Sequence, residues 1–579
     1  MKKIKILLGI AALSAALFAC NKEELVEKIP NSEIPDMLFR DYLLLHFDTD
    51  MDGFISKKEA EAVKEIDISN VRINSLTGIH FFTSLEKLIV HVSSIESLDL
   101  TSNSKLEVLD CSDNADLISL VLPDSKRLKS LNCSYTRIGS ISLNGFEFLE
   151  EFSFSQKYRG HTVEKLEINN SSLKRFIFDN GVRILNINNL PNLEFLSIRN
   201  ANDINGNHTV DLSKSTKLKF LSCEYLNCEI NTSQCPSLEE LILNLIIAKP
   251  LKLDISNNKT LHTLRIGSSN ISLSSFKNNT GLKNFTFFAL EDEPIDFSNN
   301  TLLEKLSVTG GGNINLSQCK NLTDLYLTSN SSNTINLQQF NSLKNVVLEV
   351  CKNITSINLS SCQSLDSLYL SGIDTKELYL DISNCKNLRF HYLNVGNLTK
   401  LNASGSSIKD FIYQDISSMH NPLKWNLTSL NMSNCTSLIS LLCNKNKIKE
   451  IDVSGCTSLT TLSCSENYVE DLKMSNNKAL TTLYCDNNNL KKLDLSACPA
   501  LTMLTCTNNN LENLNVSSCV VLNKLWCRNN QLKELDVHTC LVLKELSCIN
   551  NNDLKTLILA KNHQIEWLFK DEHTEIVLK

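Results

Sequence analysis

Residues 480–542 read LTTLYCDNNNLKKLDLSACPA, LTMLTCTNNNLENLNVSSCVV and LNKLWCRNNQLKELDVHTCLV, three lines of 21 residues each. The pattern can be followed from Leu438 to Asn551, and one cysteine column returns every 21 residues, at Cys443, Cys464, Cys485, Cys506, Cys527 and Cys548. In each line a leucine stands two residues before this cysteine and an asparagine three residues after it. A fixed period of this kind predicts a solenoid of stacked coils.

The segment around each cysteine has the alternation of a short strand, with Leu441 and Cys443 pointing inward and Leu442 outward. Strands of successive coils are expected to stack in parallel, about 4.8 Å apart. Asn446 and its equivalents lie at the bend after the strand, where a short amide can satisfy backbone groups inside the turn. Because one coil cannot bury its own apolar face, each coil depends on its neighbours for stability.

This unit, L-x-x-L-x-C-x-x-N-x-L-x-x-L-D-V-S-x-C, resembles the leucine-rich repeat family, and within it the cysteine-ladder repeats of bacterial internalin-like surface proteins. The resemblance covers residues 67–579, closely in the last six coils and more loosely in the middle. It implies a right-handed curved solenoid of roughly 21–24 coils, with parallel strands on a concave face, an irregular convex face with short turns, and a role in binding or adhesion. The period breaks between Leu388 and Leu427, and we expect Trp567 and Phe569 to cover the last coil.

The chain holds 21 cysteines, which in an exported protein would usually indicate disulfides. A second column lies at Cys435, Cys456, Cys498, Cys519 and Cys540, with Asn477 in the one gap. Equivalent residues of adjacent coils have parallel Cβ vectors, which do not suit the dihedral angle of a disulfide. We therefore expect reduced, buried thiols, with some bridges as the alternative. One cysteine per coil does not form a tetrahedral zinc cluster.

Residues 1–20 have the form of a targeting segment, because Lys2, Lys3 and Lys5 precede an apolar run too short to span a bilayer. The run ends in Leu17-Phe18-Ala19-Cys20, which is similar to the lipobox of bacterial lipoproteins and implies lipidation of Cys20 after cleavage before it. An ordinary secretory signal is the alternative.

Residues 21–35 form a predicted tether, which Pro30 and Pro35 would make semi-stiff. The acidic Lys22-Glu23-Glu24 resembles the signal that sends some lipoproteins to the outer face of the outer membrane. That resemblance implies a surface-exposed outer-membrane lipoprotein. A merely charged tether, on a protein that faces the periplasm, is the alternative.

Residues 48–59, DTDMDGFISKKE, fit the EF-hand calcium loop at each diagnostic position. The oxygen ligands would come from Asp48, Asp50, Asp52, the backbone carbonyl of Phe54, Ser56 through a water molecule, and Glu59. Helical spacing of apolar residues before and after the loop completes a helix-loop-helix over residues 36–66.

EF-hands usually occur in pairs, but Ile55, at the position that pairs with a second loop, has no second loop to meet. We therefore predict that residues 36–66 cap the open end of the first coil and that calcium is structural. A calcium-triggered switch is the alternative.

The outward position of each strand is where the family resemblance places a ligand. Two aromatic residues occupy it two coils apart, Tyr484 and Trp526, with Met503, Lys524 and Arg528 near them. Exposed aromatic residues beside arginine are typical of protein hot spots and sugar platforms. The alternative is that they are isolated surface residues on a tolerant face.

We weighed three functions. The first is a binding protein whose strand face holds a host or bacterial surface protein, or a glycan. The second is an envelope spacer without a specific ligand. The third, an enzyme, is disfavoured because no paired carboxylates, nucleophile elbow, phosphate loop or HExxH motif is present. A net charge of −7 without a basic stripe gives no indication of nucleic acid binding.

Overall fold

In the computed structural model the structure describes residues 27–579, apart from residues 70, 157–162, 180–181, 200–207, 248–250, 269–270, 274–275, 290–293, 339, 396 and 414–425. The predicted signal segment, Cys20 and part of the tether lie outside these residues. The chain divides into two units, one up to Ile184 and the other Leu185–Lys579, which are described separately. Among the described residues no helix reaches the length and apolarity needed to cross a bilayer.

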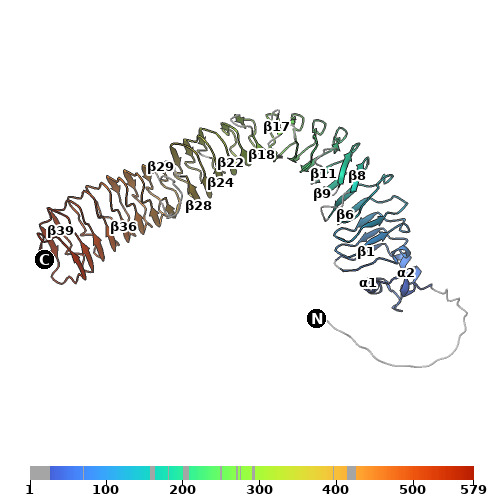
Figure 1. The fold of residues 1–579 in the computed structure, drawn as a ribbon, viewed down its shortest axis with the longest axis horizontal. Coiled ribbons are helices and arrows are strands. Elements are labelled where there is room, and N and C mark those ends of the chain that lie inside the picture. Colours follow the sequence, from blue (N-terminus) through green and yellow to red (C-terminus); the bar gives the residue numbers. More distant parts are fainter. Residues whose placement is uncertain are drawn as a thin grey trace, which may run out of the picture. The chain divides into compact units, whose positions relative to one another are not determined.

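Both units are parallel β-solenoids of the leucine-rich repeat type, with about 22 turns along the described residues, as the sequence predicts (Figure 1). The main row of parallel strands is called the strand face here. In the first unit it consists of β1 (Glu65–Asp67), β2 (Lys87–Ile89), β4 (Val108–Asp110), β6 (Ser130–Thr136), β7 (Glu151–Gln156) and β9 (Arg175–Asp179).

The strand face of the second unit is made by two sheets. The first contains β11 (Phe195–Arg199), β13 (Phe220–Glu224), β14 (Glu240–Asn244), β16 (Thr263–Ile266), β18 (Asn284–Phe288), β20 (Lys305–Thr309), β22 (Asp324–Thr328), β24 (Asn345–Glu349), β26 (Ser367–Ser371) and β28 (Phe390–Asn394). The second contains β30 (Asp410–Ile412), β32 (Ser440–Leu442), β34 (Thr461–Ser463), β36 (Thr482–Tyr484), β37 (Met503–Thr505), β38 (Lys524–Trp526), β40 (Glu545–Ser547) and β42 (Trp567–Phe569).

Shorter strands form small parallel sheets on another side of the coils. They are β3 (Ser97–Asp99), β5 (Ser119–Val121), β8 (Val163–Ile168), β10 (Val182–Ile187), β12 (Thr209–Val210), β15 (Leu251–Leu253), β17 (Ile271–Leu273), β19 (Ile295–Asp296), β21 (Ile314–Asn315), β23 (Thr334–Asn336), β25 (Ser356–Asn358), β27 (Leu378–Asp381), β29 (Leu398–Asn402), β31 (Ser429–Asn431), β33 (Glu450–Asp452), β35 (Asp471–Lys473), β39 (Glu534–Asp536), β41 (Thr556–Leu559) and β43 (Glu575–Leu578).

The strands stack in register, so that each column of the core contains equivalent residues. Leu483 pairs with Leu504, and Leu504 with Leu525. The inward residues Leu441 and Cys443 are fully buried, whereas Leu442 between them is half-buried. The predicted alternation is therefore confirmed.

The asparagine at each bend connects one coil to the next. Asn488 Nδ2 donates to the carbonyls of Cys464 in the preceding coil (3.0 Å) and of Cys485 in its own (3.1 Å). Its Oδ1 accepts from the backbone N–H of Val469 (2.9 Å). The residue before it, Asn487, has a φ of 55°, a left-handed conformation that asparagine tolerates better than most residues. The same arrangement recurs at Asn467, Asn509, Asn530 and Asn551.

The first unit begins with a small helical cap, as expected. It contains η1 (Asn31–Glu33), α1 (Met37–Phe47) and α2 (Lys57–Ala62), and a further short helix, η2 (Ile79–Phe81), follows in the first coil. Phe39 and Leu43 of α1 are fully buried, and Asp36 Oδ1 caps this helix by accepting from Phe39 N (3.0 Å). Asp36 Oδ2 accepts from the backbone N–H of Asn74 (2.8 Å) in the first coil. The strand face starts at Glu65, two residues before the predicted boundary.

The asparagine ladder gives a direct test of what holds the coils together. We expect Asn488→Ala to lower the free energy of unfolding by about 2–4 kcal/mol, because buried N–H and C=O groups of two coils lose their partner. Asn489→Ala is the matched control, since that side chain is exposed. Urea unfolding of both variants measures the difference, and equal stability would contradict the role given to the ladder.

Candidate functional site

The predicted calcium loop brings three carboxylates together between α1 and α2. One oxygen each of Asp48, Asp50 and Asp52 lies within 4.8 Å of the others. Asp48 Oδ2 accepts from Gly53 N (2.9 Å), and Gly53 has a φ of 82°, the left-handed turn for which glycine is suited. Burial, followed by the charges of Asp52 and Glu59, raises the pKa of Asp50, although a hydrogen bond from the Asp52 N–H opposes this. Crowded carboxylates of this kind fit a divalent cation with oxygen ligands.

Glu59, a predicted calcium ligand, is not one of the three clustered carboxylates. Its Oε1 accepts from Thr49 N (2.7 Å), and its Oε2 accepts from Ser56 N (2.9 Å). Ser56 and Glu59 form a capping box at the start of α2. Burial alone would raise the pKa of Glu59, but the hydrogen bonds from Thr49 and Ser56 outweigh it and lower the pKa to about 2. Glu59 therefore remains ionised at neutral pH.

The place of the missing second loop is taken by residues 27–29 of the predicted tether. Ile29 N donates to Ile55 O (2.8 Å), and Lys57 N donates to Glu27 O (2.9 Å). Ile29 and Ile55 are both buried. The neighbouring Lys28 forms an ion pair with Asp52 (2.6 Å). This part of the tether is therefore packed against the loop, a contact that the sequence does not predict because a single antiparallel bridge leaves no repeated pattern.

The strand-face residues predicted from the sequence form two groups. Lys524 Nζ lies 3.9 Å from the ring centroid of Trp526, and Arg528 Cζ lies 5.3 Å from it, both within range of a cation–π interaction. Arg528 Cζ is also 5.6 Å from the ring centroid of Phe569. The second group is a pair, in which the Tyr484 hydroxyl donates to Met503 Sδ (3.1 Å).

The two groups lie on neighbouring strands in one column. Tyr484 pairs with Thr505, and Thr505 with Trp526. Thr505 is buried, so the two aromatic side chains are separated by one small residue. Phe569, which the sequence analysis placed over the last coil, is exposed and extends this column instead.

A hollow that the sequence analysis did not identify lies where the strand face of the second unit changes sheet. Its volume is about 410 Å³, and it is lined by Ser367, Leu368, Tyr369, Arg389, His391, Tyr392, Lys409 and Asp410. The first sheet ends at β28 and the second begins at β30. The sequence signal for the hollow was present, because His391 and Tyr392 interrupt the repeat.

The chemistry of the hollow is mixed aromatic and charged. The rings of Tyr369 and Tyr392 are stacked with centroids 4.8 Å apart, and Arg389 Nε donates to Asp366 Oδ1 (2.6 Å) at the rim. His391 occupies an inward position in register with Leu368, and its ring lies 6.0 Å from that of Phe411. Burial lowers the pKa of His391, and Asp410 offsets this in part. The imidazole is therefore mainly neutral at neutral pH.

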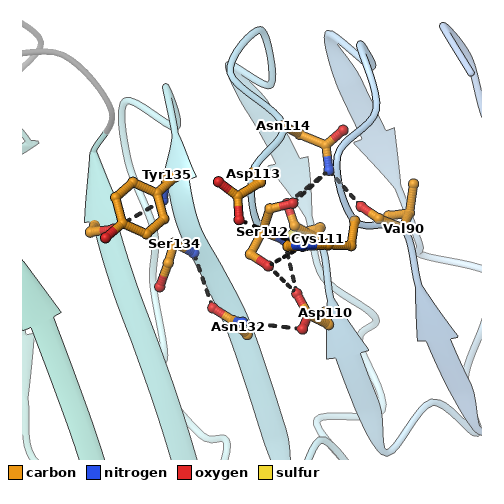
Figure 2. A network of polar contacts seen from close by, with 11 residues as sticks. Val90, Asp110, Cys111, Ser112, Asp113, Asn114, Asn132, Ser134 and Tyr135 are labelled. Atoms are coloured by element: carbon orange, nitrogen blue, oxygen red, sulfur yellow. Dashed lines mark hydrogen bonds and ion pairs between the residues drawn. The ribbon is translucent and has the colours of Figure 1, made fainter. Parts of the chain in front are cut away.

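The turns after β2 and β4, in adjacent coils of the first unit, bring a histidine close to a serine and aspartates, which are residue types of nucleophile chemistry. His91 Nδ1 lies 3.0 Å from Ser112 Oγ. The Ser112 hydroxyl donates to Asp110 Oδ1 (2.6 Å), as Figure 2 shows. A hydroxyl that donates to a carboxylate is not activated by the imidazole. Asp110 also accepts from Asn132 Nδ2 (3.1 Å), so the network joins adjacent turns.

The cysteines are core residues. All twenty described cysteines are free thiols, and all except Cys228 are buried. Cys485 Sγ donates to Thr505 O of the next coil (3.3 Å), as Cys443 does to Ser463 O (3.5 Å). Burial raises the pKa of Cys464 to about 12, so its thiolate is absent at neutral pH.

Comparison with known proteins gives fold-level likeness only. No family model and no curated protein matches the chain. Among solved structures, the functional domain of InlJ from Listeria monocytogenes, which includes a cysteine ladder, has 17% identity over 88% of this chain and 83% of its own, with a TM-score of 0.39. The Arabidopsis receptor kinase HAESA, in complex with the peptide hormone IDA and the co-receptor SERK1, has 18% identity over 88% and 91%, with a TM-score of 0.41. YopM from Yersinia enterocolitica has 18% identity over 89% and 91%, with a TM-score of 0.24. At these values no residue or ligand is carried over to this chain.

The state of the cysteines can be measured directly. At pH 8 we expect iodoacetamide to leave the strand column of the folded chain, from Cys443 to Cys548 at 21-residue steps, unmodified, because burial both blocks access to these thiols and raises their pKa. After unfolding in about 6 M guanidinium without a reductant, the twenty described thiols should all react. Mass spectrometry counts the labels. Thiols that stay blocked in the unfolded chain would reveal disulfides and contradict the structure.

Proposed function

We propose that this chain is a calcium-stabilised, lipid-anchored leucine-rich repeat protein of the bacterial cell surface that binds a protein or glycan partner through its strand face. The observation that carries the binding proposal is the hollow between β26 and β30, where Tyr369 and Tyr392 stand beside Arg389 and Lys409. Aromatic rings next to charged groups bury contact area and fix orientation at the same time.

The solenoid gives this hollow a rigid base. The inward neighbours Leu368, Leu370 and Phe411 are buried, so the outward side chains project from a packed core. A partner that binds there does not have to order the backbone first, which lowers the entropic cost of binding. The group of Lys524, Trp526 and Arg528 offers a second contact surface of the same chemistry.

Calcium would support the cap rather than the binding surface. Asp48, Asp50 and Asp52, the Phe54 carbonyl, Ser56 and Glu59 are the residues that would hold it. When bound, the ion would neutralise the three clustered carboxylates. Because the loop also pairs with residues 27–29, the ion would stabilise the junction between the tether and the first coil.

The anchor rests on the sequence from Leu17 to Cys20. Acyl chains on Cys20 would hold the protein at a membrane, and the acidic residues after it favour the outer face of the outer membrane. The alternative to a binding function is an envelope spacer. The hollow argues against it, because a spacer has no need of an aromatic recess on its strand face.

Calcium binding makes the first prediction for this function. If the loop binds calcium with a dissociation constant of about 0.1 mM, then 1 mM calcium adds about 1.4 kcal/mol to the stability of the cap. We expect slower hydrogen exchange in α1 with calcium than with EDTA, and Asp50→Ala should abolish the difference. Asp41→Ala, an exposed acid of α1, is the control. Identical exchange with and without calcium in the wild type would exclude this role.

Partner binding gives the second prediction for this function. The lipid-free chain is screened on glycan and surface-protein arrays, and each hit is titrated against variants. We expect Tyr392→Ala to weaken binding in the hollow by at least about tenfold, the scale of an aromatic hot spot. Trp526→Ala tests the second surface separately. Tyr468→Ala is the control, because this exposed tyrosine lies in the turn between β34 and β35. A partner indifferent to both variants would remove the strand face as the site.

A further inference from the structure

The last coil of the second unit presents two strands whose outer edges have no neighbour among the described residues, β42 and β43. Strand β43 also carries residues of the core columns that lack a covering layer. Ile576 and Leu578 are 42% and 56% exposed, although they stack on the buried Leu557 and Leu559. Trp567, which the sequence analysis expected to cover the last coil, is 59% exposed. An open strand edge next to apolar side chains is a site of strand addition.

The sequences of the two edge strands are self-complementary in charge. Residues 566–570 read EWLFK and residues 575–579 read EIVLK, so each has a glutamate, three apolar residues and a lysine. If such a strand pairs antiparallel with its own copy about its central residue, each glutamate faces a lysine at both ends. Opposite charges at facing positions stabilise a strand pair, and like charges destabilise it.

The free backbone groups fit the same register. In β43, Glu575 N and Lys579 N donate to Lys555 O and Leu559 O (both 2.8 Å), so these residues face inward to β41. The backbone N–H and C=O groups of Ile576 and Leu578 therefore point to the open edge. Pairing centred on Val577 places Ile576 opposite the Leu578 of the second copy, where both residues exchange hydrogen bonds.

Strand β42 gives the equivalent result. Trp567 N donates to Lys544 O (3.0 Å) and Phe569 O accepts from Cys548 N (2.8 Å), so Leu568 points its backbone groups outward. Pairing centred on Leu568 joins the two copies of this residue by hydrogen bonds. Trp567 of one copy then faces Phe569 of the other, in the position where antiparallel side chains are closest.

We propose that this surface, β42 and β43 of the last coil, binds a second copy of the chain in an end-to-end dimer with twofold symmetry. The twofold axis would pass between each strand and its copy, level with Leu568 in β42 and with Val577 in β43, so that each strand pairs antiparallel with its own copy. The core columns that end at Ile576 and Leu578 continue into the partner. An isologous contact of this kind closes on itself, so assembly stops at two copies.

The contact is small for a stable interface, since it involves two short strands per copy. We therefore expect a dissociation constant on the order of 10 µM. Sedimentation velocity of residues 21–579, which include all the described residues, should show a concentration-dependent dimer between about 0.5 and 50 µM. A chain that remains monomeric throughout this range overturns the proposal.

A charge exchange tests the register. Glu575→Lys places a lysine opposite Lys579 of the second copy, and Lys579→Glu places a glutamate opposite Glu575, so each variant alone should dimerise at least tenfold more weakly. When the two variants are mixed, every facing pair is again of opposite charge, and a heterodimer should form. Restoration on mixing also controls for the ion pair of Lys579 with Asp536 in its own copy (3.3 Å), which no mixing can repair.

Two controls complete the experiment. Glu512→Lys makes the same change of charge at an exposed position of another coil and should leave the dimer unchanged. Melting temperatures of all variants show that the solenoid is intact. If Glu575→Lys dimerises as the wild type does, or if the mixture stays monomeric, then β43 does not pair as proposed.

Discussion

The structure depends on one constraint: a single coil cannot supply hydrogen-bond partners for all the buried backbone groups of its own bend. After each strand the chain bends, and the carbonyls that the ladder asparagine reaches at this bend lie in the buried interior. In the last coils the amide of one asparagine bonds to carbonyls of its own coil and of the coil before it, as Asn488 does with Cys485 and Cys464. A buried carbonyl without a partner costs more than a single hydrogen bond contributes. The stacking of coils is therefore required by the backbone as well as by the leucine core.

This constraint divides the residues of a coil into two classes. Inward positions are set by packing, and there leucine and cysteine recur because a small thiol fills the column beside a leucine. Outward positions on the strands are less uniform. Ser463, Tyr484, Thr505 and Trp526 occupy one column in register, and the small Ser463 and Thr505 are buried while the rings of Tyr484 and Trp526 remain partly accessible. Aromatic side chains that stand out between small neighbours are suited to recognition, which is the reason for placing the binding function there.

The regular repeat made the fold predictable from the sequence. The candidate site could be predicted only in part, because it lies where the repeat is irregular. Leu441, Cys443 and Asn446 could be placed from period alone, because each has five or more equivalents that report the same environment. The cluster of Asp48, Asp50 and Asp52 could be located because the proposed calcium motif fixes the spacing of these residues. The pairing of Ile29 with Ile55 could not, since one bridge between two short segments has no pattern. The hollow beside Tyr392 lies where one sheet ends and the next begins, at a point where the 21-residue period is interrupted. The sequence therefore shows only that the repeat breaks there, not that a hollow forms.

The first coil is covered by a helical cap, whereas the last coil has no cover among the described residues. At the first coil, Phe39 and Leu43 enter the core and Asp36 bonds to the backbone at Asn74, so the open columns are covered by a segment with its own chemistry. At the last coil, the columns run out to Ile576 and Leu578 without a cover among the described residues. A solenoid end of this kind is a template for a further strand, and most strands that could add to it would meet mismatched charges. The strand with a lysine opposite each glutamate and a glutamate opposite each lysine is the same strand reversed, so the charges of β42 and β43 favour the proposed pairing with a second copy over pairing with an arbitrary strand.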